Sequence, residues 1–169
     1  MLKNRNIILR AIKTKDLALL YTAINDPTLV QFNSAYKPIH EAKHQAWFNF
    51  ISESKEIVFF IIEKNKQAIG TIQLFDINWI YRNAELSIRI FKKENMGKGL
   101  GSIAINIMLD HAFNDLGLIR IWLRVFSDNN RAIRAYKKIG FTQEGIMKKA
   151  AFIRGEYKDI HILAKLNDK

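Results

Sequence analysis

The sequence contains no cysteine, so disulfide bonds, thiol nucleophiles and thiolate metal ligands are excluded. Proline is also scarce, with two among 169 residues, while 49% of the residues are hydrophobic. This composition disfavours disordered or low-complexity segments. No apolar run approaches the roughly 18 residues of a membrane span, and the first residues do not resemble a signal peptide. We therefore expect an ordered cytoplasmic protein without a membrane partner, and its length favours one domain over residues 1–169.

Acidic residues are few relative to basic ones. Sixteen Asp and Glu stand against 27 Lys and Arg, which gives a net charge of +11. Such an excess favours a polyanionic partner, for example nucleic acid or a cofactor with several phosphates. The basic residues are spread along the chain and no nucleic-acid-binding motif is recognisable. A phosphate-bearing cofactor is therefore preferred over nucleic acid.

Hydrophobic periodicity predicts an α/β (α+β) protein with about seven strands and about four helices. Alternating apolar and polar residues indicate strands, and apolar residues three or four apart indicate helices. The expected strands cover residues 7–12, 56–64, 67–77, 83–91, 118–126, 141–153 and 156–166. The expected helices cover residues 13–26, 40–51, 102–117 and 129–140, and the first of them is expected to end at Asp26 and Pro27.

The fragment HEAKH at residues 40–44 matches a zinc-binding pattern in which two histidines lie on one helical face beside a glutamate base. It falls at the start of a predicted helix, where His40 precedes regular helical structure. A zinc peptidase also needs a third ligand and a substrate cleft, for which the sequence offers no sign. We expect no metal, and we interpret the fragment as a solvated helix start at which Glu41 interacts favourably with the helix dipole.

Glycines 97, 99 and 101 lie between a predicted strand and a predicted helix. The first turn of a helix has unpaired N–H groups, and glycine lets a phosphate group approach them closely. The spacing differs from the phosphate-binding loop of nucleotide triphosphatases and from the dinucleotide-binding fingerprint. The pattern indicates a pyrophosphate-binding loop, with an unliganded glycine-rich turn as the alternative.

Two stretches together resemble the GNAT superfamily of N-acetyltransferases. The run MGKGLG, residues 96–101, resembles the acetyl-CoA loop [RQ]-x-x-G-x-[GA]. The run NNRAIRAYKKIGF, residues 129–141, resembles the signature N-x-x-A-x-x-x-Y-x-x-x-G-F. Residues 7–166 are similar to the branch that holds ribosomal-protein N-terminal acetyltransferases and spermidine N-acetyltransferases. The resemblance implies a GNAT fold, in which a mixed, mostly antiparallel, twisted sheet flanked by helices holds acetyl-CoA where two parallel strands splay apart.

The resemblance implies that acetyl-CoA is the co-substrate and that a primary amine is the acetyl acceptor. Direct attack by the amine in a ternary complex requires proximity and orientation rather than an enzyme nucleophile. Position 96 departs from the pattern, because Met96 replaces the usual Arg or Gln, and weaker cofactor binding is therefore expected. The cofactor contacts are expected at Ile88, Ile90, Met96, Gly97, Lys98, Gly99, Leu100, Gly101, Ser102, Asn129, Arg131 and Ala132.

Acetyl transfer from a thioester to an amine needs a proton acceptor and a proton donor. An amine with a pKa near 10.4 is neutral in only about one molecule per thousand at pH 7, so a base must help to deprotonate it. Glu85 is the first candidate and Glu144 the second, with water as a further alternative, while an ion pair with Arg82 or Arg89 is the structural explanation for Glu85. By resemblance, Tyr136 donates a proton to the departing thiolate.

The acceptor pocket is the least defined part of the site. By resemblance it is built largely from residues 26–56, where Tyr36, His44 and Trp47 are the candidates. The acceptor is a protein N-terminus, a polyamine or an amino sugar, and the positive charge of the chain favours a phosphorylated sugar or a ribosomal partner over a polycation. A non-catalytic acyl-CoA-binding or nucleic-acid-binding GNAT-like module is the alternative function. The oligomeric state stays open, with a homodimer or a higher homo-oligomer among the alternatives.

Overall fold

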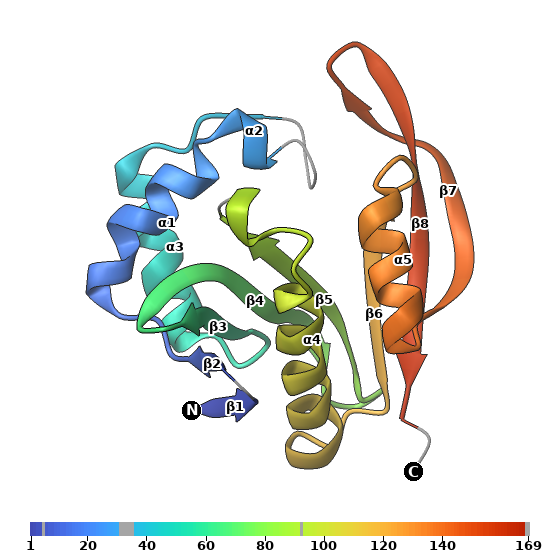
Figure 1. Cartoon of the computed structure of the whole chain (residues 1–169), viewed down its shortest axis with the longest axis horizontal. Helices are drawn as coiled ribbons and strands as arrows, with labels where there is room; N and C mark the ends of the chain where they lie inside the picture. The colour runs from blue at the N-terminus through green and yellow to red at the C-terminus, as the bar shows by residue number, and fades with distance from the viewer. Residues whose placement is uncertain (5, 31–35, 92, 168–169) are drawn as a thin grey trace.

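The computed structural model describes residues 1–4, 6–30, 36–91 and 93–167, and its strands form one twisted sheet (Figure 1). The sheet has eight strands in the order β1-β2-β3-β4-β5-β6-β8-β7. Every pair of neighbours is antiparallel except β5 and β6, which are parallel. The strands are β1 (Leu2–Asn4), β2 (Ile7–Arg10), β3 (Val58–Lys64), β4 (Gln67–Asn78), β5 (Asn83–Ile90), β6 (Arg120–Phe126), β7 (Thr142–Ile153) and β8 (Glu156–Leu166).

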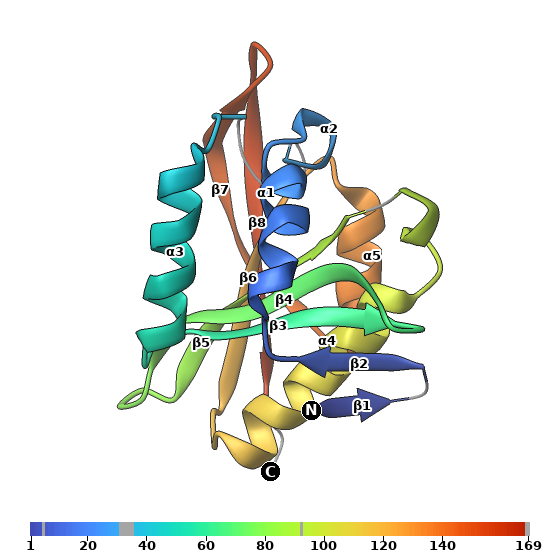
Figure 2. The same ribbon diagram turned by 90° about the vertical axis from the view of Figure 1, so that its left-hand side faces the viewer.

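Helices cover both faces of the sheet (Figures 1 and 2). The α-helices are α1 (Leu17–Ile24), α2 (Pro27–Val30), α3 (Glu41–Glu53), α4 (Leu100–Asp110) and α5 (Asn130–Ile139), and short 3-10 or π turns cover Thr14–Asp16, Lys93–Asn95 and His111–Asp115. Helices α4 and α5 lie on one face, and α1 to α3 lie on the other. Within the described ranges, none of the helices combines the length and the apolar character that crossing a membrane requires.

Each face has its own hydrophobic core. The larger core packs α4 against the sheet through fully buried side chains such as Leu74, Met108 and Leu123. Helix α4 is apolar nearly all round because it is enclosed on several sides. On the other face, Leu20 of α1 and Leu29 of α2 pack with Ile61 and Phe91 in a smaller core. The two cores fix the sheet between the helical layers.

The parallel pairing of β5 with β6 is short. It joins Asn83–Glu85 to Arg120–Trp122, whereas the antiparallel pairing of β5 with β4 continues to Ile90. Beyond Glu85 the two parallel strands diverge, as Figure 1 shows. The divergence separates the peptide groups of β5 from those of β6 and opens a gap in the middle of the sheet.

The predicted fold class is confirmed, with two additions. Strand β1 at Leu2–Asn4 was not predicted, so the described sheet has one strand more than the seven expected. Pro27 was expected only to end a helix, but it begins α2. Proline suits a first helical position because its missing N–H would have no partner there, and the Asp26 carboxylate accepts a hydrogen bond from the Thr28 N–H at 2.8 Å. Within the proposed acceptor segment, residues 31–35 lie outside the described residues.

A buried ion pair joins the end of β2 to the turn before α1. Arg10 donates to both carboxylate oxygens of Asp16, at 2.7 and 2.9 Å, and to Glu63 at 2.6 Å. Arg10 and Asp16 are both buried. The hydrogen bonds from Arg10 hold the pKa of the Asp16 carboxyl below its ordinary value.

Replacing Asp16 with asparagine should lower the free energy of unfolding by about 3 kcal/mol, because the buried Arg10 loses a charged partner. Urea denaturation at pH 7 measures this loss. Since the pKa of Asp16 is depressed in the folded state, its contribution is present above the unfolded value of about 3.9 and disappears as the pH falls through the folded-state value. The stabilities of the variant and the parent protein should therefore converge in acid.

The control is Asp115→Asn in the π turn that follows α4, where the carboxylate is 59% exposed and pairs with His111. Exposed pairs contribute about 0–1 kcal/mol, so this variant should be nearly as stable as the parent. Equal losses in the two variants would contradict a structural role for the Arg10–Asp16 pair.

Candidate active site

A cleft of about 670 Å³ lies where β5 and β6 diverge, between the start of α4 and one side of α5. It brings together residues that are far apart in the sequence. Both predicted catalytic residues, Glu85 and Tyr136, line it. The predicted cofactor residues in its lining are Ile88, Ile90, Met96, Gly97, Gly99, Leu100, Gly101, Ser102, Asn129, Arg131 and Ala132.

The glycine loop forms one wall of the cleft at the start of α4. Gly97 and Gly99 both have φ near +73°, a left-handed conformation that glycine adopts without strain. A Cβ atom on either residue would meet no other atom within 4 Å, so open space lies in front of both. The first intrahelical bond runs from Ile103 N–H to the Gly99 carbonyl. The preceding N–H groups of α4 therefore lack helical partners and can bind an anion.

Helix α5 supplies the opposite, basic wall. The Asn129 side chain caps this helix by accepting a hydrogen bond from the Ala132 N–H at 3.3 Å. Arg131, Arg134 and Lys138 project from it and line the cleft. The Met96 sulfur accepts a hydrogen bond from the Arg131 guanidinium at 3.5 Å. A positive charge therefore lies beside position 96 although this residue is itself uncharged.

Tyr136 lies on α5 with its ring partly buried in the larger core. The ring packs edge-on against Phe141, with 5.8 Å between the centroids. Burial raises the pKa of Tyr136 to about 12, because the phenolate would lose its hydration. The hydroxyl therefore keeps its proton at physiological pH and can donate a hydrogen bond into the cleft.

Glu85 lies on β5 and is only 4% exposed. Its two oxygens accept hydrogen bonds from Arg124 of β6 at 2.8 and 3.0 Å. The alternative explanation for Glu85, an ion pair with Arg82 or Arg89, named the wrong partner, because the parallel register places Glu85 beside Trp122 and so brings Arg124, two residues further along β6, onto the same face. A carboxylate has about four lone-pair sites, so Glu85 can still accept a proton or a hydrogen bond.

Several predicted residues lie outside the lining of the cleft. Lys98 lies within the glycine loop, but its side chain is exposed and is absent from the lining of the cleft. Glu144 is on β7, where its ion pair with Arg120 lowers the pKa of its carboxyl. Tyr36 is exposed, and it too is absent from the lining.

His44 and Trp47 pack against α1 and the sheet rather than into the cleft. The Nε2 atom of His44 is 3.1 Å from the Leu17 carbonyl, and its ring stacks on Trp47 with 5.2 Å between the centroids. Trp47 in turn packs edge-on against Phe59. His40 is the residue before α3, so the two histidines of the HEAKH fragment have different surroundings. The acceptor-binding role of His44, Trp47 and Tyr36 stays a prediction.

Part of the cleft lining was not predicted from the sequence. Ser87 and Arg89 line the cleft beside Glu85. Strand alternation could have found them, since residues two apart share a face. Arg124 and Leu29 had no comparable signal, because only the folded chain brings β6 and α2 to this cleft.

Comparisons with known proteins agree with this geometry. Residues 6–142 match the family described as an acetyltransferase (GNAT) domain. The chain is 32% identical to a spermidine N(1)-acetyltransferase of Vibrio cholerae over 98% of its length and 96% of the relative, and 30% identical to that of Escherichia coli K12 over 91% and 82%. The crystal structure of spermidine N-acetyltransferase from Vibrio cholerae with CoA and spermine superposes with a TM-score of 0.92, 30% identity and 98% coverage of both chains. The chain therefore belongs to the GNAT family and is an N-acetyltransferase that uses acetyl-CoA.

Proposed function

We propose that the cleft between β5 and β6 is the active site and that the acceptor amine reaches it from the face of the sheet covered by α1 and α2. The observation that carries this proposal is the convergence of the glycine loop, Glu85 and Tyr136 on one cavity. Leu29 of α2 lines the same cavity, which supports access from that face. The N-terminal turn of α4 and the cations of α5 then bind the phosphates of the co-substrate.

Acetyl-CoA, when bound, supplies an acetyl group activated as a thioester. The cleft fits an extended molecule with phosphates at one end, because open space adjoins Gly97 and Gly99 and exposed cations stand opposite. Gly101 packs close to β5, where an added Cβ would lie 3.7 Å from Ile88. The diphosphate is held by backbone N–H groups near Gly99, and Arg131 supplies the charge that Met96 lacks.

Tyr136 is the proposed proton donor to the departing sulfur. A proton transfer from a phenol with a pKa of about 12 to a thiolate with an ordinary pKa of about 8.5 is uphill by roughly 5 kcal/mol. Burial in the same cleft also raises the pKa of the thiol, which reduces this difference. Tyr136 therefore acts first by hydrogen bonding to the developing negative charge and transfers its proton late.

Glu85 is the proposed acceptor of the amine proton, directly or through water. Arg124 fixes the orientation of the carboxylate with two hydrogen bonds. A buried carboxylate at the amine side of the cleft also attracts the ammonium form that predominates at neutral pH. Because both Glu85 and Arg124 line the cleft, Arg124 is proposed as a positioning residue for Glu85.

Residues 1–169 form a single domain under this proposal, because the sheet is continuous from β1 to β7 and both hydrophobic cores pack on it. Light scattering after size-exclusion chromatography tests whether the chain assembles into a homodimer or a larger homo-oligomer.

Two of the relatives are named spermidine N(1)-acetyltransferases, so spermidine serves as the reference acceptor. The test measures thiol release from acetyl-CoA with spermidine, amino sugars, amino acids and short peptides with a free N-terminus. We expect thiol release that depends on one class of primary amine and exceeds the hydrolysis seen without an acceptor. Tight acetyl-CoA binding without release by any amine would favour a non-catalytic acyl-CoA-binding protein instead.

A further inference from the structure

Arg89 lies on β5 at the α1–α2 side of the cleft. Leu86, Ile88 and Ile90 pack with the α4 core on the other face. Strand alternation therefore directs Arg89 to the same face as Glu85. Arg89 lines the cleft with Ser87. It lies four positions beyond Glu85, which corresponds to about 13 Å along the strand.

The guanidinium of Arg89 makes no hydrogen bond or ion pair with the described part of the chain. Its Nε atom is buried and makes no hydrogen bond there. Burial lowers the pKa of Arg89 from its ordinary value, and no carboxylate offsets this effect. Three other arginines with altered pKa values each have carboxylate partners, namely Arg10 with Asp16 and Glu63, Arg120 with Glu144, and Arg124 with Glu85. A partly buried cation without a partner is costly and calls for an explanation.

The charges around Arg89 oppose a polycationic acceptor. Among the described residues that line the cleft, Glu85 is the one carboxylate, and it already pairs with Arg124. Arg131, Arg134 and Lys138 also line the cleft, but under the proposed function they bind the phosphates of the co-substrate, so the unpaired cation that faces the acceptor is Arg89. Electrostatic complementarity therefore favours an acceptor with negative charge.

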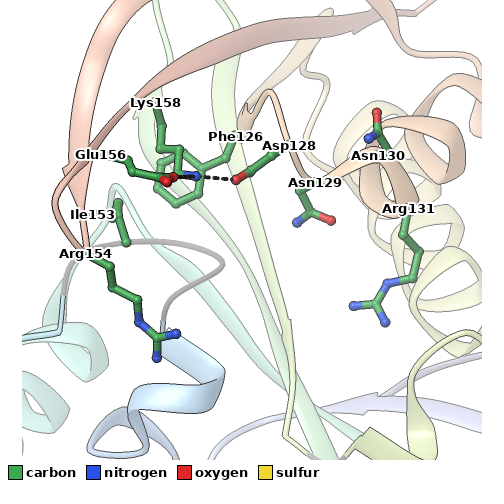
Figure 3. Close-up of a pocket in the computed structure, with 9 residues that line it drawn as sticks. All are labelled: Phe126, Asp128, Asn129, Asn130, Arg131, Ile153, Arg154, Glu156 and Lys158. Carbon is green, nitrogen blue, oxygen red and sulfur yellow. Dashed lines mark hydrogen bonds and ion pairs between the residues drawn. The ribbon is translucent and has the colours of Figure 1, made fainter.

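A neighbouring cavity of about 600 Å³ lies at the turn between β7 and β8, and its lining also has no excess of acidic side chains among the described residues (Figure 3). It shares Phe126, Asn129 and Arg131 with the cleft. Its two carboxylates, Asp128 and Glu156, both accept hydrogen bonds from Lys158 at 2.8 Å, and Arg154 lines it as well. Within the described residues, the lining therefore carries three cationic side chains, Arg131, Arg154 and Lys158, against two carboxylates.

We propose that Arg89 binds an anionic group of the acceptor, so that the substrate is a small molecule carrying both a primary amine and a carboxylate or phosphate. This inference rests on the proposed function of the cleft. The planar guanidinium binds either anion through two parallel hydrogen bonds, and the anion supplies the partner that Arg89 lacks. The amine then lies toward Glu85 and Tyr136, and Arg89 acts as a specificity-determining residue.

A series of six-carbon amines tests the charge preference at constant length. It consists of 6-aminohexanoate, hexylamine and 1,6-diaminohexane, with glucosamine 6-phosphate and glucosamine as a second pair that distinguishes phosphate from carboxylate. We expect kcat/KM to fall from the anionic to the neutral to the dicationic amine. Arg89→Gln should lower kcat/KM for the preferred anionic amine about 30-fold, mainly by raising KM. It should leave kcat/KM for hexylamine nearly unchanged.

The matched control is Lys43→Gln, which removes the same charge from an exposed position of α3 outside both cavities. It should leave the ratios of kcat/KM among the anionic, neutral and dicationic amines unchanged. A second measurement is independent of turnover: with CoA present, the preferred anionic amine should raise the Tm of the parent protein but not that of Arg89→Gln. Without ligands, Arg89→Gln should be at least as stable as the parent, because it removes a partly buried charge that has no partner among the described residues.

The outcomes separate the two proposals. Turnover that is fastest with 1,6-diaminohexane or spermidine would overturn the anionic substrate class and leave amine acetylation intact. Equal losses of kcat/KM for anionic and neutral amines in Arg89→Gln would also overturn it. If no amine releases thiol, the proposed function fails, and the Tm shift with anionic amines then decides whether Arg89 binds an anion.

Discussion

Replacing Gly99 with aspartate is expected to weaken acetyl-CoA binding by at least about 100-fold, or roughly 2.7 kcal/mol. Gly99 precedes α4 with φ +73°, and a Cβ there would point into open space that belongs to the cleft. An aspartate would place a negative charge where the diphosphate binds, and two like charges 4 Å apart repel by about 4 kcal/mol even at an effective dielectric constant of 20. Isothermal titration calorimetry with CoA measures the loss.

Two variants separate this electrostatic effect from backbone strain. Gly99→Asn adds nearly the same volume without charge, and asparagine and aspartate both tolerate the left-handed conformation better than other residues. It should weaken binding less than Gly99→Asp. Gly117→Asp places the same residue at φ +66° in open surroundings, outside the cleft lining, and should bind CoA normally. Normal CoA binding by Gly99→Asp would show that the diphosphate does not lie at the start of α4.

Replacing Tyr136 with phenylalanine is expected to lower kcat by about 100-fold or more, because a positioned proton donor contributes roughly 10²- to 10⁴-fold. The KM for acetyl-CoA should change little, since the lost interaction forms with charge that develops on the sulfur. Phenylalanine keeps the ring that packs on Phe141, so the fold should be preserved. Steady-state kinetics with a saturating acceptor measures the change.

The pH dependence gives an independent test of this role. A phenol whose pKa is raised to about 12 stays protonated across the accessible range, so kcat/KM should rise with pH as the acceptor loses its proton and show no descending limb from Tyr136 below pH 10. The control is Tyr81→Phe in the exposed turn between β4 and β5, which should have parent activity. Parent-like kcat in Tyr136→Phe would assign proton donation to another group or to water.

The features that were predicted correctly are those encoded by residues close together in the sequence. The glycine loop and the following apolar helix are encoded within one short segment, and the same holds for Asn129 and Tyr136 on α5. Because strand and helix periodicity is a local property, it also predicted the interior of the sheet. Strand β1 was missed because three residues carry too little pattern, and Pro27 was misjudged because proline can end one helix or begin another.

The acceptor side could not be predicted because it is assembled from distant segments. The Glu85–Arg124 ion pair depends on the register of a parallel pairing that no local pattern specifies. His44 and Trp47 looked like pocket residues in the sequence, yet the packing of α3 on α1 places them outside the cleft lining. Arg89 was considered only as a partner for Glu85, because the absence of a counterion is visible only after folding.

The short pairing of β5 with β6 makes the stability of the protein depend on its co-substrate. Three residue pairs join the two parts of the sheet at this seam, and the open gap beyond them is the place where acetyl-CoA binds under the proposed function. A ligand that contacts both sides of the seam stabilises the folded state in proportion to the logarithm of its concentration. The unliganded protein should therefore unfold at a lower temperature than the CoA-bound protein, and a thermal-unfolding series at increasing CoA concentration measures the difference.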